Sequence, residues 1–409
     1  YTAGGVRHLN TKLKGKRILI YSHDSFGLGH LRRCRTIAHA LVDHFAGLNV
    51  LIISGSPIIG SFDFKSRVDF VRIPGVVKLR GGDYTPLSEH IDLVRTLELR
   101  SSIVAQTAAT FAPDLFLVDK EPLGLRGEVA VTLETLRRKG VQTVLGLRDI
   151  LDDSVLLKAD WENRGTPKDL ENYFEEIWVF GVKAMGNPLA GLEVSERSQE
   201  MMVYTGYLKR TIPELTKAPV SLPADPFLLV TPGGGGDGET LIDWVLSALE
   251  SQPRPAMPVV IVLGPFMAQT LRRGFQHRIS RLKGVHVITF DAHMELLMDR
   301  AVGVVAMGGY NTFCEILSLD KRAVLVPRST PRMEQTLRAR RAASLGLIAM
   351  LDSEGDRSPQ AMSAALRALE RQGLPSAAGA NALLSGLEVI CARVATVLGG
   401  GSIHHQDIA

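Results

Sequence analysis

The chain has 409 residues, more than the roughly 100–200 residues of one ordinary domain, so two domains are expected. Hydrophobic residues make up 45%, charged residues 22% and aromatic residues 6%, which excludes a disordered or collagen-like chain and is typical of an α/β protein. The net charge of +4 is too small for this length to indicate a nucleic-acid partner.

The cysteines and the apolar segments give further expectations. Cys34, Cys314 and Cys391 have no paired spacing, which predicts free thiols in a reducing compartment, and no Cys/His spacing is typical of a metal site. We find no apolar run of about 18 residues and no signal-peptide pattern, so no membrane span is expected. The sequence therefore predicts a cytoplasmic protein without a metal or a cofactor.

Short aliphatic runs, separated by amphipathic stretches, recur through the first half of the chain. Continuous rather than alternating hydrophobicity is typical of parallel strands that are buried on both faces. Residues 1–210 are therefore predicted to form a doubly wound, Rossmann-like domain. Its predicted strands are 17–24, 49–55, 70–76, 114–121, 141–149, 176–182 and 202–207.

The same pattern restarts after a proline-rich segment. Residues 211–226 contain four prolines and no helical or strand period, and we predict that they form the interdomain linker and a hinge. A second Rossmann-like domain is predicted over 227–385, with a C-terminal helix and flexible tail over 386–409 and a helical stretch over 360–398. Its predicted strands are 227–236, 258–264, 285–290, 302–309, 323–329 and 347–351.

Residues that follow the strands are the candidates for a site, because open parallel sheets bind ligands beyond the carboxyl ends of their strands. After the first strand, Gly27 and Gly29 allow a tight turn, and His30 opens a helix whose free N–H groups favour an anion. His30 can act as a general base or can simply cap its own helix. Arg32 replaces the third glycine of a dinucleotide-binding motif, so that motif is excluded.

Charged residues follow several other strands of the first domain. The segment 78–83 follows the third strand, Asp119 and Glu121 lie at the end of the fourth, and Asp149 follows the fifth. They are expected on the acceptor side of the site, where Asp119, Glu121 and Asp149 are alternatives to His30 as the general base. Each of them can also be an ordinary solvated residue.

Glycines mark the corresponding loops of the second domain. Gly233 to Gly236 separate a strand from a helix and leave backbone amides open to a bulky anion, but the Lys-Ser/Thr ending of an ATPase loop is missing. Gly308 and Gly309 end another strand, and Asn311 or Thr312 is expected to cap the next helix. Glu315, expected in the first turn of that helix, can accept hydrogen bonds from the paired hydroxyls of a ribose. An acidic residue there also has a purely dipolar explanation.

Gly308, Gly309, Thr312 and Glu315 form the motif Gly-Gly-x-x-Thr-x-x-Glu. A strand ending at Pro327 follows, and then Glu334 and Gln335 at the start of the next helix. This arrangement resembles the donor-binding half of GT-B glycosyltransferases. Residues 227–350 are most similar to the family of N-acetylglucosaminyltransferases that complete lipid II. The resemblance implies the GT-B fold, with two Rossmann-like domains facing across a cleft. It also implies that Glu315 holds the ribose of UDP and that Gln335 contacts the donor sugar, although this chain has Glu334 where the family has a second glutamine.

The resemblance completes the predicted nucleotide-sugar site, with the glycines at the diphosphate and residues 290–294 around the base. The site comprises Gly29, Gly233, Gly234, Gly235, Gly236, Phe290, Asp291, Met294, Gly308, Gly309, Asn311, Thr312, Glu315, Glu334 and Gln335.

The segment 27–34, GLGHLRRC, resembles instead the nucleotide-sugar hydrolases of pseudaminic acid and spore-coat polysaccharide synthesis, where the histidine is linked to attack by water. The two resemblances imply an inverting, metal-independent hexosyltransferase that moves a sugar from a UDP-linked donor to a glycan or lipid-linked acceptor in polysaccharide biosynthesis. A hydrolase or epimerase of the same architecture is the alternative, and a non-catalytic sensor is a third hypothesis. Contact with the inner face of the cell membrane is left open by the basic residues near 32–35 and 78–80.

Overall fold

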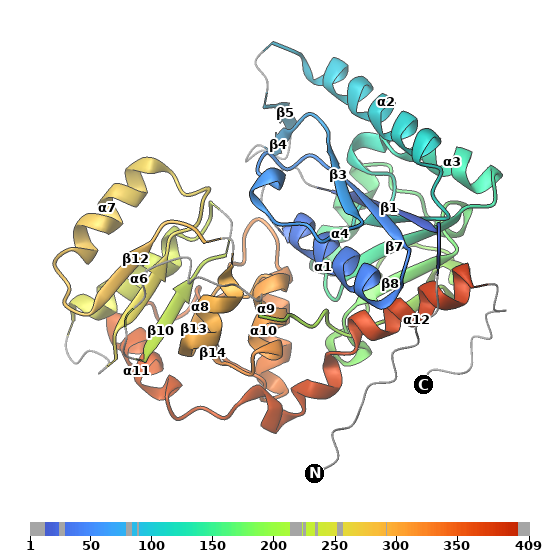
Figure 1. The fold of residues 1–409 in the computed structure, drawn as a ribbon. Helices are drawn as coiled ribbons and strands as arrows, with labels where there is room; N and C mark the ends of the chain where they lie inside the picture. Colours follow the sequence, from blue (N-terminus) through green and yellow to red (C-terminus); the bar gives the residue numbers. More distant parts are fainter. Residues whose placement is uncertain are drawn as a thin grey trace.

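The computed structural model describes residues 13–23, 29–78, 84–87, 90–212, 223, 226–233, 236–251, 257–291 and 293–399. Its main elements are two parallel sheets, one in each half of the chain, with helices on both faces of each sheet (Figure 1). The predicted α/β class with two doubly wound, Rossmann-like domains is therefore confirmed.

The N-terminal sheet has seven parallel strands in the order β3-β2-β1-β6-β7-β8-β9. Successive connections run outward in one direction from β1 to β3 and in the other direction from β6 to β9, so the order reverses between β1 and β6. The crevice above the ends of these two strands is where open sheets bind ligands. The strands are β1 (Arg17–Ser22), β2 (Asn49–Ser54), β3 (Val68–Arg72), β6 (Leu115–Asp119), β7 (Gln142–Arg148), β8 (Glu176–Phe180) and β9 (Met202–Tyr204).

The C-terminal sheet has six parallel strands in the order β12-β11-β10-β13-β14-β15, which reverses between β10 and β13. Its central strands are fully buried aliphatic segments, as the continuous hydrophobic runs predict. The strands are β10 (Phe227–Thr231), β11 (Val259–Val262), β12 (Val285–Ile288), β13 (Ala301–Ala306), β14 (Arg322–Leu325) and β15 (Ala349–Met350).

The helices cover the sheets with one apolar stripe each. In α1 (Gly29–His44), the stripe of Leu31, Cys34, Ala38 and Leu41 is buried, with Ile37 beside it. The other helices are α2 (Leu93–Phe111), α3 (Ala130–Arg138), α4 (Ser154–Asn163), α5 (Glu196–Glu200), α6 (Glu239–Glu250), α7 (Gln269–Ile279), α8 (Met294–Arg300), α9 (Tyr310–Ser318), α10 (Glu334–Ser344), α11 (Pro359–Leu369) and α12 (Gly386–Leu398).

Two predicted segments are divided into separate elements in the structure. The strand expected over 70–76 ends at Arg72, because Pro74 has no N–H to continue the ladder, and a short antiparallel hairpin of β4 (Val76–Lys78) and β5 (Tyr84–Pro86) follows. The helical stretch expected over 360–398 is divided into α11 and α12, with two 3-10 turns between them. Most of the predicted linker 211–226 lies outside the described residues.

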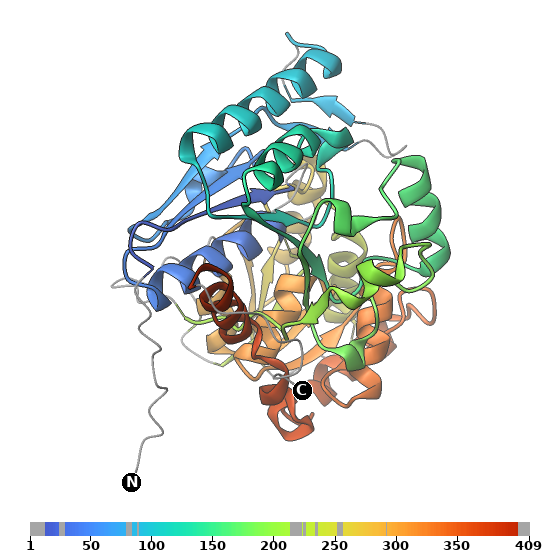
Figure 2. The ribbon, with the colours of Figure 1, turned by 90° about the vertical axis from the view of Figure 1, so that its right-hand side faces the viewer.

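The C-terminal helix α12 returns to the N-terminal domain and lies against α1 (Figures 1 and 2). By length and composition, Ala380–Leu398 is apolar enough to cross a membrane, with a mean hydropathy of 1.5, contrary to the expectation that the chain has no such run. Its α-helical part, α12, has 13 residues and is about 20 Å long, short of the roughly 30 Å of a bilayer core. Arg393 of α12 also pairs with the buried Glu176 of β8. We therefore interpret α12 as a helix that packs on the N-terminal domain.

A buried ion pair joins the carboxyl ends of the two sheets. Arg338 of α10 donates from Nε and Nη2 to the two oxygens of Asp149, which follows β7, at 2.8 and 2.6 Å. Both side chains are fully buried, and the hydroxyl of Tyr207 donates to the same carboxylate at 2.7 Å. Because the two donor nitrogens of the guanidinium are held in one plane, this bidentate contact constrains both the distance and the orientation of the domains.

Replacement of Arg338 should therefore destabilise the protein strongly. The Arg338→Met variant leaves the buried Asp149 without its counterion, and we expect a loss of about 3–5 kcal/mol in the free energy of unfolding, measured by urea titration with tryptophan fluorescence. The matched control is Arg340→Met in the same helix, because Arg340 forms only an exposed 3.8 Å pair with Asp352. That variant should lose at most about 1 kcal/mol. Equal stabilities of the two variants would contradict a stabilising role for the buried pair.

Candidate functional site

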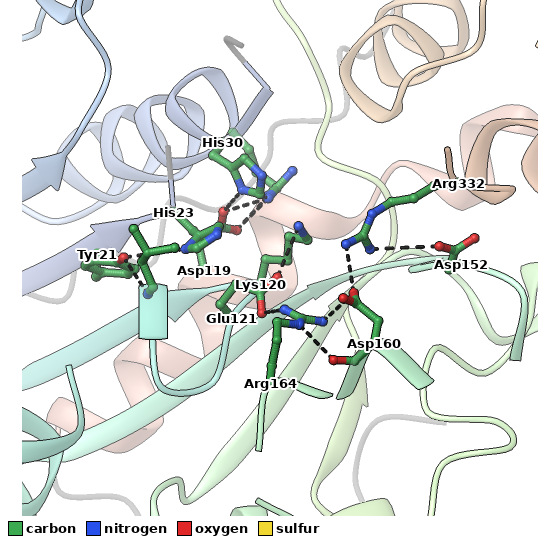
Figure 3. Close-up of polar contacts among 12 residues, drawn as sticks. Tyr21, His23, His30, Asp119, Lys120, Glu121, Asp152, Asp160, Arg164 and Arg332 are labelled. Carbon is green, nitrogen blue, oxygen red and sulfur yellow. Dashed lines mark hydrogen bonds and ion pairs between the residues drawn. The ribbon is translucent and has the colours of Figure 1, made fainter. Parts of the chain in front are cut away.

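His30 and Asp119 meet above the adjacent ends of β1 and β6 (Figure 3). His30 is the second residue of α1 and Asp119 is the last residue of β6, so the reversal of strand order brings them together. His30 Nδ1 lies 2.5 Å from Asp119 Oδ2. Arg33, almost one turn further along α1, donates from Nε and Nη2 to Asp119 at 2.7 to 2.9 Å. One helix thus supplies both partners of the carboxylate.

Burial and charge decide the protonation of this pair. Burial raises the pKa of Asp119, but the charges of Arg33 and His30 outweigh burial and lower it to about 2. Burial lowers the pKa of His30 to about 3, against the opposing charge of Asp119. Near pH 7, Asp119 is therefore ionised and His30 is neutral. Since an ionised carboxylate can only accept, Nδ1 carries the imidazole proton and Nε2 keeps a lone pair that can take a proton.

Asp149, one of the alternative bases, has no free carboxylate oxygen. It is 1% exposed, and its oxygens accept from Arg338 and Tyr207 as described above. An acceptor hydroxyl could reach Asp149 only after this buried interdomain pair had broken. We therefore do not retain Asp149 as the general base.

Glu121, the other alternative, belongs to a row of ion pairs that links the domains (Figure 3). It pairs with Arg164 of α4, and Arg164 pairs with Asp160 at 2.6 Å. Asp160 also accepts from Arg332, which precedes α10 in the C-terminal domain, at 2.8 Å. Arg332 lies in turn 3.9 Å from Asp152. Glu121 is thus neutralised within an ionic contact between the domains and is separate from the His30–Asp119 pair.

The glycine loops of the C-terminal domain meet the start of α1. Gly233 and Gly308, which follow β10 and β13, have φ values of +83° and +84°, a conformation that favours glycine. A Cβ added to Gly233 would lie 4.0 Å from Thr312 Oγ1, so the two loops are adjacent. Asn311 donates from Nδ2 to the carbonyl of Gly29 at 2.9 Å. The structure thus brings these predicted site residues together; Gly234 and Gly235 lie outside the described residues, and Gly236 approaches the carbonyl of Phe266.

The start of α9 differs from the prediction. Gly309 is the N-cap residue, so Asn311 and Thr312 lie inside the first turn and do not cap the helix. Glu315 consequently lies in the second turn rather than the first. The reason is that the extended backbone of Gly309 already ends the loop, which leaves the Asn311 side chain free to contact Gly29 instead of its own helix.

Glu315 is buried and is bound by the N-terminal domain. Its carboxylate accepts from Arg32 of α1, and Arg32 also donates to Glu295 of α8 at 2.9 Å. Burial raises the pKa of Glu315 to about 7; the charge of Arg32 opposes this shift and that of Glu295 adds to it. A ribose bound at Glu315 would therefore share this carboxylate with Arg32 or displace it.

The remaining predicted donor residues surround the same loops. Gln335 donates to the carbonyl of Met307 at 2.9 Å in the amide orientation that satisfies both of its ends. Glu334 accepts from Arg328 at 2.9 Å through Oε1, while its Oε2 is buried and lacks a partner among the described residues. The residues predicted near the nucleotide base lie where the C-terminal domain approaches the N-terminal domain. Phe290 packs against an apolar cluster that includes Leu31 and Phe62. Asp291 is buried, and Met294 begins α8.

Two arginines of α1 have roles that sequence analysis missed. Arg33 is 2% exposed and binds Asp119, and Arg32 binds Glu315. The i, i+3 spacing of His30 and Arg33 places them on one face of the helix and is the signal that could have paired them. The carboxylate partners lie 86 to 283 residues away and leave no local signal. Among the described residues, no group of three or more His, Cys, Asp or Glu side chains is arranged to hold a metal ion.

Comparison with solved structures identifies the class of fold. The glycosyltransferase of kitacinnamycin superposes with a TM-score of 0.61 at 15% identity, over 94% of this chain and 98% of that chain. MurG from Acinetobacter baumannii gives 0.52 at 13% identity, over 90% and 99%. A candidate UDP-N-acetylglucosamine 2-epimerase from Listeria monocytogenes gives 0.64 at 13% identity, over 96% and 99%. The protein has the GT-B fold, as predicted.

Sequence comparison then characterises the C-terminal domain. Residues 227–391 match the glycosyltransferase family 28 C-terminal domain, which supports the predicted relation to GT-B glycosyltransferases. No curated protein matches the sequence. The predicted likeness of residues 27–34 to nucleotide-sugar hydrolases stays a prediction.

The neutral state of His30 gives a testable dependence of stability on pH. An unfolded histidine takes up a proton near pH 6.5, whereas folded His30 stays neutral down to about pH 3, so acid destabilises the fold between these values. In the His30→Asn variant the unfolding free energy should fall less steeply with decreasing pH, by up to about 1.4 kcal/mol per pH unit. Urea unfolding of both proteins at pH 7, 6, 5 and 4.5 measures this. Parallel pH profiles would mean that His30 is not held neutral.

Proposed function

We propose that this protein is an inverting glycosyltransferase that transfers a hexosyl group from a UDP-linked donor to a hydroxyl of a glycan or lipid-linked acceptor. The observation that carries the proposal is that the two sheets meet at their switch points, the places where the order of strands reverses. The His30–Asp119 pair lies at the switch point of the N-terminal sheet. The glycine loops lie at the switch point of the C-terminal sheet, and Asn311, which follows one of them, contacts Gly29 beside His30. The family 28 match of residues 227–391 supports placing the donor on the C-terminal domain.

In this proposal, His30 is the general base. Nε2 of the neutral imidazole takes the proton of the acceptor hydroxyl as its oxygen attacks the anomeric carbon from the face opposite the leaving group, which inverts that carbon. Asp119 fixes the tautomer and stabilises the imidazolium that forms, and Arg33 keeps Asp119 ionised. Because the pKa of His30 lies at about 3, the base is available throughout the physiological range.

The leaving nucleoside diphosphate is proposed to lie against the backbone amides of Gly233, Gly236, Gly308 and Gly309. Amides that point at one anion, together with the N-terminal dipole of α9, stabilise its developing charge without a metal ion. Glu315 is proposed to hold the ribose, and Glu334 and Gln335 the donor sugar. No cofactor beyond the nucleotide sugar is needed for this reaction.

A lipid-linked acceptor is supported by apolar side chains near the hairpin of the N-terminal domain. Leu87, Ile91 and Val94 lie between β5 and the first turn of α2 and are 40 to 66% exposed. Such side chains can contact the lipid of an acceptor or the membrane that carries it. We accordingly propose that the protein works in polysaccharide biosynthesis in the cytoplasm, at the inner face of the membrane.

The test is a donor panel followed by transfer assays. A thermal-shift screen of UDP, dTDP and GDP sugars selects the donor, because a ligand that binds only the folded state raises the melting temperature. With that donor, nucleotide release should require an acceptor and should persist in EDTA. The His30→Ala variant should transfer about 10²–10⁴-fold more slowly and keep its nucleotide affinity. His39→Ala, in the same helix, should leave the rate unchanged.

The same assays distinguish the alternative enzymes of this fold. Rapid release of free sugar without acceptor would identify a hydrolase, in which water takes the place of the acceptor. Reversible conversion of the donor sugar at its second carbon would identify an epimerase. Full transfer activity of His30→Ala would show that His30 is not the base.

Glu315 should contribute to donor affinity through its charged hydrogen bonds to the ribose. The Glu315→Ala variant should bind the nucleotide about 1.5–3 kcal/mol more weakly in a calorimetric titration. Glu295→Ala is the matched control, because Glu295 shares the ion pair with Arg32 but is not placed at the ribose. Its nucleotide affinity should stay close to that of the wild type. Unchanged affinity in Glu315→Ala would refute the ribose assignment.

A further inference from the structure

The three most deeply buried arginines among the described residues are each paired with a carboxylate, whereas Arg148, which is half-buried beside the candidate site, is not. Arg33, Arg100 and Arg338 each bind a carboxylate at 2.6 to 2.7 Å. Arg148 has no hydrogen bond or ion pair within the part of the chain that the structure describes, and its Nε is buried without an acceptor. A buried N–H group without an acceptor is unfavourable for stability, and none of the described residues supplies an acceptor for Arg148 Nε.

Arg148 lies one strand away from the point where the strand order of the N-terminal sheet reverses. It is the last residue of β7, the strand next to β6 and its Asp119. The residue after it, Asp149, is bound by Arg338, whose Nη1 also donates to the carbonyl of Gly308 at 3.1 Å. The neighbour of Arg148 in the chain is thus connected, through Arg338, to the glycine loop that we propose for the diphosphate.

The charges around Arg148 do not neutralise it. Burial lowers the pKa of Arg148 to about 10; Glu334 opposes this shift, whereas Arg33 and Arg338 add to it. The group still carries a full charge near pH 7. Glu334 comes from the opposite domain, already accepts from Arg328, and makes no hydrogen bond with Arg148. A ligand with negative charge is the partner that this position favours.

We propose that Arg148 binds the diphosphate of the donor from the N-terminal side, opposite the glycine amides. This inference rests on the proposed function, because it assumes a nucleotide-diphosphate donor. The planar guanidinium presents donors that match two phosphate oxygens. During transfer, the bond between the anomeric carbon and the diphosphate oxygen breaks and its electron pair goes to the diphosphate. The acceptor oxygen forms the new bond and its proton goes to His30. A fixed cation at the diphosphate stabilises the charge that develops there.

The experiment compares phosphate-bearing and phosphate-free ligands. Calorimetric affinities for UDP, inorganic pyrophosphate and uridine are measured for the wild type, Arg148→Met and Arg148→Lys, with the base replaced if the donor panel selects another nucleotide. We expect Arg148→Met to bind UDP and pyrophosphate about tenfold to a hundredfold more weakly and uridine equally well. Arg148→Lys keeps the charge but loses the planar guanidinium, so its affinities for UDP and pyrophosphate should lie between those of the wild type and of Arg148→Met. The exposed Arg138 of α3 provides the control Arg138→Met, which should behave as the wild type.

Stability supplies a second readout. Because the described residues give the half-buried Arg148 no counterion, the melting temperature of Arg148→Met should stay at or above that of the wild type, in contrast to Arg338→Met. A much lower melting temperature would make Arg148 a structural residue and overturn the inference.

The failures of the two proposals can be separated. If the wild type binds neither nucleotide diphosphates nor pyrophosphate, the proposed function fails and this inference fails with it. If the wild type binds UDP and Arg148→Met binds it equally well, the assignment of Arg148 is wrong while the proposed function stands. A raised KM for the acceptor with unchanged UDP affinity would likewise overturn the assignment and move Arg148 to the acceptor.

Discussion

The bidentate contact between Arg338 and Asp149 is the constraint on which the rest of this structure depends. Two charged groups without access to water are stable only when their geometry satisfies both, so the pair fixes how α10 of one domain meets the end of β7 in the other. A hinge motion that opened the domains widely would have to break the pair at a cost of several kcal/mol. Opening of the fold is therefore restricted on this side of the interface.

The fold places its candidate chemistry where the order of strands reverses, and this explains why the site draws on such distant residues. In each sheet, the connections leave the switch point in opposite directions and expose the ends of two neighbouring strands. The N-terminal sheet uses this space for His30 and Asp119, and the C-terminal sheet uses it for the glycine loops. In the proposed function, the first group supplies the base and the second the anion-binding surface that glycosyl transfer requires.

Arginines serve two different purposes across this interface. Those bound to carboxylates, such as Arg33 and Arg338, give the interface specific geometry, and Arg33 also lowers the pKa of Asp119. Arg148 gives neither benefit, because no carboxylate satisfies its buried Nε. Arg32 is intermediate, since it neutralises Glu315, the residue that we place at the ribose. Stability and ligand binding therefore compete for the same carboxylate, and a donor must contribute enough binding energy to replace or share that contact.

The sequence alone was sufficient for the class of fold and for most strand positions, and it supplied the candidate site residues, which stay predictions. Continuous aliphatic runs indicate buried parallel strands because both faces of such a strand are covered, and glycines after strands indicate loops that approach a ligand closely. The start of α10 and the helical position of His30 were also predictable, because periodicity and strand ends are local properties.

What only the tertiary structure decided was the partner of each charged group. His30 and Asp119 are 89 residues apart, and Arg338 and Asp149 are 189 residues apart, so no local pattern relates them. Asp149 was an equally good candidate for the base until its carboxylate was found to be occupied, and Glu315 moved to the second turn because Gly309 capped the helix. The physical reason is that burial and the nearest opposite charge set the state of an ionisable side chain, and both depend on the packing of segments that are remote in sequence.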